Sequence, residues 1–134
     1  MKRIILFATL LLSLCGLLVA DDLAEFQPLM KKAAGACGAL GKALEAGDAS
    51  GVQTSSQAVA EHFGTMAGWW EKKGVSDAHG FASDVAAKAD AINGMAGKGD
   101  LDGAKAQFGM LRGNCKSCHV AHRAKADDGS WQIK

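Results

Sequence analysis

The sequence lacks an excess of charge of either sign, which limits the partners that it could bind. Lys and Arg number 15 in the 134-residue chain, and Asp and Glu number 14. A chain so nearly neutral is not expected to bind nucleic acid through electrostatic attraction. Internal repeats and low-complexity tracts are absent as well. The length and composition therefore predict one globular domain without a nucleic-acid partner.

The first 20 residues differ in character from the rest of the chain. Two basic residues precede an apolar run over residues 4–19, and Ala20 is followed by two aspartates. This order predicts a signal peptide over residues 1–20, cleaved after Ala20, and export to the periplasm. A retained membrane anchor is the alternative, although the run is short for a spanning helix. Cleavage would leave a mature domain over residues 21–134, with 13 basic and 14 acidic residues and no stable membrane insertion.

Signals for β-structure are scarce in the mature chain. No Asn-Gly turn lies between alternating strands, and alanine-rich segments are separated by short clusters of glycine, aspartate and serine. These clusters divide the chain into four predicted helices, at about 22–46, 50–72, 77–96 and 101–125. Ser50, Ser76 and Asp100 are predicted N-caps, because each offers a side-chain oxygen to first-turn amides.

The first and last predicted helices have the clearest periodicity. In each helix apolar residues recur at alternating steps of three and four, from Leu23 to Leu44 and from Leu101 onward. Such stripes and short loops predict an all-α fold, an antiparallel up-down-up-down four-helix bundle. Pro28 leaves two alternatives for the first helix. Either it kinks the helix, or the regular helix begins there.

Three cysteines would remain after export, an odd number that does not suit a disulfide framework. Two of them lie in the sequence C-x-x-C-H at residues 115–119, which is the attachment motif for c-type haem. Cys115 and Cys118 are three residues apart on a predicted helix, so both can form thioethers with one porphyrin. His119 then directs its imidazole to the iron from the same side. The motif predicts one covalently attached haem c, held by Cys115 and Cys118, with His119 as an iron ligand.

Other interpretations of this motif are open on the residues alone. A redox dithiol would need a βαβ context, which the helical pattern does not provide. A zinc site would add His122 to the ligands, but four ligands within eight residues of one helix are difficult to arrange tetrahedrally. A disulfide between Cys115 and Cys118 is the third alternative. Without haem, the chain would be a metal-binding or structural bundle.

The order of these features resembles the class II cytochromes c, the cytochrome c-prime family with its low-spin relatives. The residues that carry the resemblance are the run 113–119 and Arg123, four residues after the histidine. The resemblance implies a left-handed four-helix bundle with one covalent haem and His119 as the proximal ligand. It also implies that Arg123 lies against a haem propionate; the alternative is a solvated cation at a helix end. The sequence departs from the family at residues 120–122 and in an additional tail, about 126–134.

The second axial position of the iron divides this family by function. Some members have no sixth ligand and bind small gases such as NO or CO, and others use a methionine from the first helix. Met30 lies on the inward stripe of the first predicted helix, so we expect it to ligate the iron; the alternative is that it only fills space in the core. His62 is a weaker candidate. The remaining methionines of the mature chain are interpreted as core or surface residues: Met66, Met95 and Met110.

The prediction that follows is a periplasmic electron carrier that cycles Fe(III)/Fe(II), is not an enzyme and meets redox partner proteins. A five-coordinate, gas-binding cytochrome is the alternative. Exposed cations could form a rim that attracts an acidic partner, or they are ordinary surface charge: Lys31, Lys32, Arg112, Lys116 and Lys125. The resemblance also makes a homodimer an expectation. His79 is expected to be solvated, and Trp131 and Ile133 are expected to fold the tail back onto the bundle.

Overall fold

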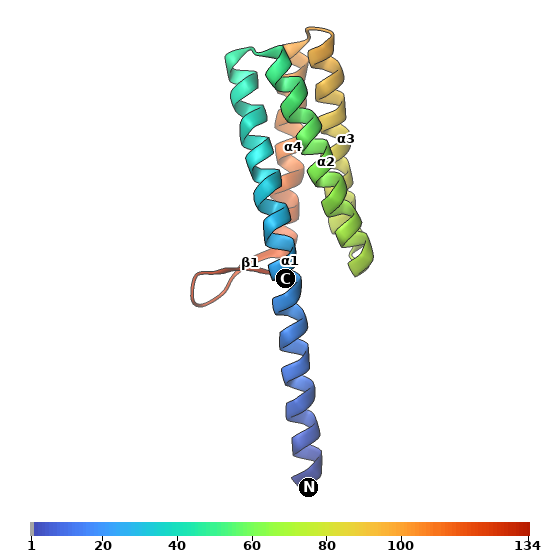
Figure 1. Ribbon diagram of the computed structural model, residues 1–134, viewed down its shortest axis with the longest axis vertical. Coiled ribbons are helices and arrows are strands. Elements are labelled where there is room, and N and C mark those ends of the chain that lie inside the picture. The colour runs from blue at the N-terminus through green and yellow to red at the C-terminus, as the bar shows by residue number, and fades with distance from the viewer. Residues whose placement is uncertain (1) are drawn as a thin grey trace.

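A computed structural model gives the backbone of residues 2–134 and the side chains of residues 22–134. Four helices are followed by two short strands, as Figure 1 shows: α1 (Lys2–Ala46), α2 (Ala49–Lys73), α3 (Ser76–Gly97), α4 (Leu101–His122), β1 (Arg123–Lys125) and β2 (Trp131–Ile133). The predicted all-α up-down-up-down bundle is confirmed. The side chains of the predicted signal peptide lie outside the described residues, so the signal peptide and its cleavage stay predictions.

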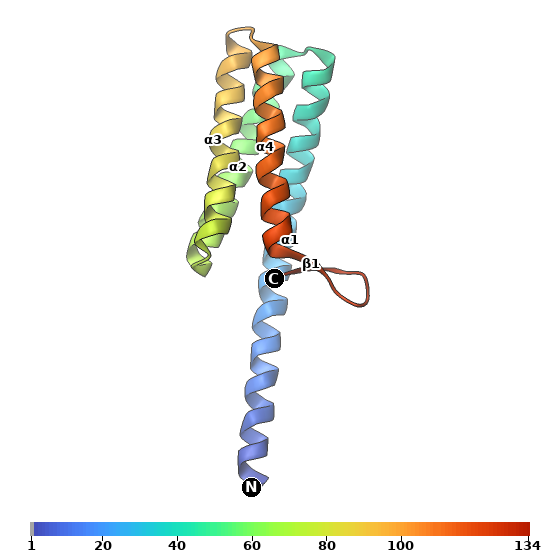
Figure 2. The same ribbon diagram turned by 180° about the vertical axis from the view of Figure 1, so that it is seen from behind.

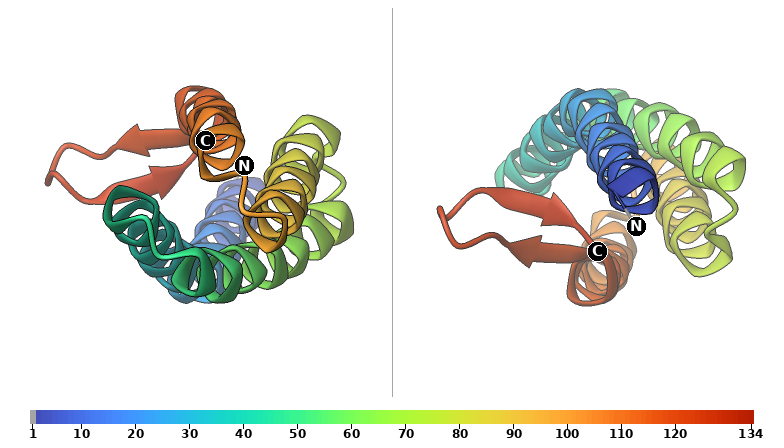
Figure 3. Two further views of the ribbon diagram at one scale, coloured as in Figure 1. Left: turned by 90° about the horizontal axis from the view of Figure 1, so that it is seen from above. Right: turned by 90° about the horizontal axis from the view of Figure 1, so that it is seen from below.

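The four helices pack unevenly around the bundle. α2 packs along α3, α3 along α4 and α1 along α2, but α1 and α4 make few contacts. Figure 2 shows α4 beside α3, and α1 extending well beyond the other three helices. In the views along the axis, the strands lie on the side where α1 and α4 face each other (Figure 3). The bundle is therefore loosest between α1 and α4.

Small and branched side chains fill the core between the helices. The largest apolar side chains that are wholly buried come from all four helices: Leu40, Val52, Val59, Val85, Ile92 and Leu111. At the far end of α2, Trp69 and Trp70 are only 8% and 5% exposed. Their rings lie 4.8 and 5.0 Å from the ring of Phe26 on α1. This aromatic cluster joins α1 to α2 next to the open α1–α4 side. Within the part of the chain that has described side chains, no helix is long and apolar enough to cross a membrane.

The helix caps differ in part from those predicted. Asp100 caps α4 as expected, accepting a hydrogen bond from the Gly103 amide at 2.8 Å. α2 begins one residue earlier than predicted, so its cap is Asp48, which accepts from the Gly51 amide at 3.0 Å, and Ser50 lies inside the helix. α3 begins at Ser76 without a side-chain cap. Aspartate takes the cap at α2 because it stands at the last extended position before the first turn.

At the helix ends, one open alternative is decided and one prediction is corrected. Pro28 lies inside α1, so the regular helix does not begin there. α4 ends at His122 and not at 125, because Arg123 is extended (φ −120°, ψ 129°) and residues 123–125 pair with the tail. Strand pairing provides hydrogen-bond partners for the backbone N–H and C=O groups of this segment. It also places Ile133 against the core, which a longer helix could not do.

The C-terminus of α2 gives a test of backbone geometry. Gly74 caps α2 with φ +72°, a left-handed conformation that disfavours any residue with a Cβ. Gly74→Ala is expected to lower the free energy of unfolding by about 1 kcal/mol. Gly64→Ala in the same helix is the matched control, because this exposed position has helical geometry and open space around it. The control should raise stability by about 0.5–1 kcal/mol. Thermal or denaturant unfolding of the two variants measures both changes, and equal effects would contradict the cap.

Candidate functional site

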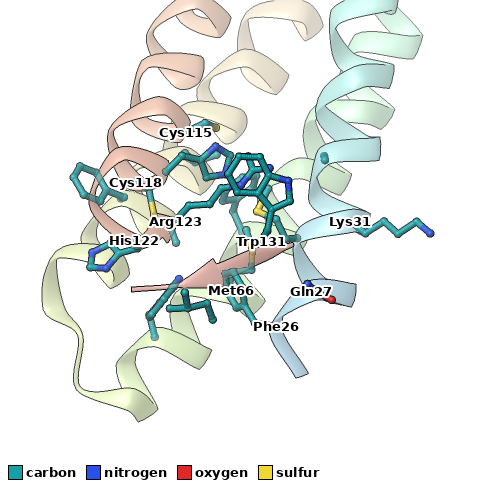
Figure 4. Close-up of a pocket in the computed structure, with 18 of the residues that line it drawn as sticks. Phe26, Gln27, Lys31, Met66, Cys115, Cys118, His122, Arg123 and Trp131 are labelled. Atoms are coloured by element: carbon teal, nitrogen blue, oxygen red, sulfur yellow. The ribbon is translucent and has the colours of Figure 1, made fainter. Parts of the chain in front are cut away.

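A hollow lies between α1 and α4 at the end of the bundle that carries the strands. One cavity of about 310 Å³ is lined by residues of all four helices and of both strands. A second cavity, of about 670 Å³, lies on the α1–α4 side. The two cavities have seven lining residues in common: Met30, Ala34, Phe63, Cys115, His119, Arg123 and Trp131. We therefore treat both as one space, the α1–α4 hollow, part of which is drawn in Figure 4.

The last two turns of α4 supply the sulfur and imidazole groups of the hollow. Cys115, Cys118 and His119 stand at positions i, i+3 and i+4, so the helix presents them on one side. All three are half-buried and line the hollow. Burial raises the pKa of the Cys115 thiol and raises the pKa of Cys118 to about 11, so both stay protonated near neutral pH. Burial, followed by the charge of Arg123, lowers the pKa of His119 and favours the neutral imidazole that binds metals.

α1 supplies the wall that faces this part of α4. Met30 is half-buried and lines both cavities, as does His119. Figure 4 shows Phe26 and Gln27 lower on the same helix, and Lys31 extending away from the hollow. The structure thus brings the methionine and the histidine predicted from sequence to one space. Whether they ligate iron stays a prediction.

The inner wall of the hollow is apolar and comes from α2 and α3. Phe63, Met66 and Trp70 of α2 are buried there, with Phe81 and Val85 of α3 beside them. Nothing in the sequence indicated that these residues of α2 and α3 form one wall of the site. Met66 is a core residue, in agreement with its interpretation.

The other histidines have different surroundings. His62 does not line either cavity, although Phe63 next to it does. His79 was expected to be solvated; instead it is half-buried, and its Nδ1 lies 2.9 Å from the Ala67 carbonyl oxygen. His122 lines the hollow from the same helix as His119, and its Nε2 lies 2.8 Å from Asp77 Oδ2.

Arg123 lies at the rim of the hollow, one turn beyond His119. Its guanidinium stacks on the indole of Trp131, with Cζ 3.4 Å from the ring centroid. The predicted return of the tail is confirmed, since Ile133 packs against the core. The sequence did not predict that Trp131 lines the hollow. The only signal for this position was the presence of an aromatic residue in the additional tail.

The side chains that line the hollow bear on the interpretations that the C-x-x-C-H motif leaves open. Among residues 22–134, Cys37, Cys115 and Cys118 are all free thiols. In the same part of the chain, no three His, Cys, Asp or Glu side chains gather closely enough to hold a metal ion, which gives no support to a zinc site. Two free thiols and an imidazole on one wall and an apolar inner wall are the groups that a haem c site requires, and the thioether on another wall is one of the axial ligands that haem proteins use.

Comparison with known families supports the same chemistry. Residues 65–123 match the family model of cytochrome C′, a segment that includes the C-x-x-C-H motif and Arg123. The match confirms the resemblance to the class II cytochromes c, the cytochrome c-prime family, that the sequence predicted. Haem c is the cofactor that this family implies. No curated protein and no solved structure shows significant similarity to the chain.

Cys37 lines the hollow but is not part of the attachment motif. Its pKa is raised from 9.0 to about 11, mainly by burial and then by the charge of Cys115, while Arg112 acts in the opposite direction. With haem attached, Cys115 would carry no thiol, but burial, the largest cause, would remain. At neutral pH a smaller fraction of Cys37 should then be thiolate in the folded protein than in the unfolded chain.

Alkylation kinetics of the mature haem-loaded protein test this prediction for Cys37. Because the thiolate is the reactive form, the rate with iodoacetamide should rise about tenfold per pH unit from pH 7 to 10. The unfolded chain is the control, and its rate should level off near pH 9. A plateau at the same pH in the folded protein would contradict the raised pKa.

Proposed function

We propose that the chain is an exported c-type cytochrome that carries single electrons on one covalently attached haem. The observation that carries this proposal is that Met30 of α1 and His119 of α4 line the same hollow, next to Cys115 and Cys118. In this proposal the two cysteines hold the porphyrin as thioethers, and His119 and Met30 ligate the iron. Proteins of the cytochrome c′ family are generally exported to the periplasm, in agreement with the predicted signal peptide over residues 1–20.

The roles of the protein residues follow from their chemistry. A bound haem supplies the reversible Fe(III)/Fe(II) couple. A methionine thioether favours reduced iron and therefore raises the reduction potential. The buried wall of Phe63, Met66 and Val85 excludes water, which also disfavours the more highly charged oxidised state. Both effects suit a carrier that forms no product of its own, so we propose that the protein is not an enzyme.

Exposed cations around the hollow support a protein partner of opposite charge. Lys31 lines the first cavity, and Arg112 and Lys116 line the second. Lys32 is exposed beside Lys31, and Lys125 lies over Trp131 with Nζ 5.0 Å from the ring centroid. On a nearly neutral chain, such a cationic rim would steer an acidic redox partner toward the hollow. The proposed partners are therefore acidic redox proteins, and a homodimer stays an expectation of the family resemblance.

A five-coordinate, gas-binding cytochrome is the second candidate function. It is favoured by the apolar inner wall of the hollow, which would suit an uncharged diatomic ligand. In that case Met30 would pack in the core and leave one axial position of the iron open. The two candidates share the attachment residues and differ only in the role of Met30.

The optical spectrum of the protein exported with the haem-attachment machinery separates these candidates. The electron carrier should give a low-spin spectrum in both oxidation states, with the weak far-red band of methionine-ligated ferric haem. A high-spin spectrum that changes when carbon monoxide is added would contradict the electron carrier and support the gas-binding candidate. A chain that acquires no Soret band would overturn both.

A further inference from the structure

The chain after α4 forms a well-defined hairpin rather than a loose tail. Strands β1 and β2 pair antiparallel, and the Ala126 amide donates to the Ser130 carbonyl at 2.9 Å. Within the turn, the Ser130 amide and hydroxyl both donate to Asp128 Oδ1, at 2.9 and 2.6 Å. Gly129 completes the turn with φ +83°. These bonds fix the direction in which β2 returns to the bundle.

The base of the hairpin is fastened to two helices. The Lys134 amide donates to the His122 carbonyl at 3.0 Å, at the end of α4. The His122 ring pairs with Asp77 in the first turn of α3. Ile133 packs against the core from β2. The hairpin is therefore held across the open side of the bundle, where α1 and α4 make few contacts (Figure 3).

Trp131 is the residue of β2 that lines both parts of the hollow. It has 43% of its surface exposed. In the strand pairing Trp131 is opposite Lys125, and Arg123 lies two residues along the same strand, so the three side chains share one face of the hairpin. Figure 4 shows Trp131 and Arg123 together between α4 and α1.

The stacked geometry leaves Arg123 able to bind an anion. A guanidinium stacked on a ring uses its face, so its in-plane N–H donors are free to bind a carboxylate in bidentate fashion. Among the described side chains, no carboxylate forms an ion pair with Arg123. An unpaired guanidinium at the rim of an apolar hollow therefore has room for an anionic group of a ligand.

We propose that Trp131 is a positioning residue that closes the outer wall of the haem site and holds Arg123 against the haem carboxylates. The inference rests on the proposed haem attachment, but not on the role of Met30. A carboxylate left without a cation favours Fe(III), whereas a carboxylate paired with Arg123 does not. Loss of the Trp131 ring should thus lower the reduction potential by the same route as loss of the Arg123 charge.

Potentiometric titration of the mature haem-loaded protein tests this role. Arg123→Gln is expected to lower the midpoint potential, and Trp131→Ala to lower it by about half of that shift or more. Trp131→Phe, which keeps an aromatic face, should restore the wild-type value. Trp131→Leu keeps apolar volume without an aromatic face, so it should behave like Trp131→Ala. It replaces the alanine variant in the test if that variant does not fold. Met110→Ala, at an exposed apolar residue outside both cavities, is the control and should leave the potential unchanged.

The double variant shows whether Trp131 acts through Arg123. In the Arg123→Gln background, Trp131→Ala should cause little further shift, because the charge that it positions is already absent. Additive shifts, or a Trp131→Leu protein with the wild-type potential, would overturn the positioning role. A wild-type chain without covalent haem would instead overturn the proposed function itself, so the two failures are distinguishable.

Discussion

Replacing Met30 by alanine is expected to convert the haem-loaded protein from a low-spin to a high-spin cytochrome. The substitution removes the thioether from α1 and leaves the hollow otherwise lined by the same groups. The far-red band of the ferric protein should disappear, and the ferrous protein should bind carbon monoxide at least roughly tenfold more tightly. The reduction potential should fall, because the thioether favours reduced iron. Absorption spectra and a potentiometric titration measure these changes.

Met95 provides the matched control for this substitution. It is also half-buried and packs against the core, but it lines neither cavity. Met95→Ala should lower stability by about 1–3 kcal/mol through lost packing and leave the spectrum unchanged. If Met30→Ala behaves in the same way, Met30 is a packing residue and the gas-binding candidate gains support.

Replacing Cys115 and Cys118 together by serine is expected to abolish covalent haem attachment almost completely. The thiols of these two residues are the groups in the predicted attachment motif, and both line the hollow from α4. The measurement is the haem absorbance that stays with the protein after denaturing electrophoresis or acid extraction. Wild-type protein should retain nearly all of its haem, and the double variant should retain nearly none.

Cys37 serves as the control for this loss. It is another half-buried thiol that lines the hollow, but it lies on α1 outside the attachment motif. Cys37→Ala should therefore keep covalent haem at the wild-type level. A double variant that still holds haem covalently, or a Cys37→Ala protein that loses it, would contradict the assignment of the attachment residues.

The bundle could be predicted from sequence because its signals are local and repeated. Apolar steps of three and four residues recur over several turns in α1 and α4, and glycine and aspartate clusters mark each connection. The C-x-x-C-H motif is equally local, since five consecutive residues carry it. These features needed no knowledge of how distant segments meet.

What could not be predicted depends on contacts between distant segments. The hairpin has strands of three residues, too short to show an alternating pattern, and it forms only because the tail returns to residues 123–125. The α1–α4 hollow depends on how far apart those helices lie, which periodicity does not determine. Trp131 shows the limit most clearly, because its place in the site follows from the hairpin, from the end of α4 at His122 and from the stack with Arg123.

Tryptic peptide mapping of the wild-type mature protein tests the central claim most directly. Trypsin cuts after Arg112, Lys116 and Arg123, so the two motif cysteines lie in separate peptides, 113–116 and 117–123. The account predicts that mass spectrometry finds these peptides joined through one haem, or as a single haem-bearing peptide 113–123 if the cut after Lys116 is hindered. Recovery of both peptides without haem, with free thiols or with a disulfide between them, would contradict it.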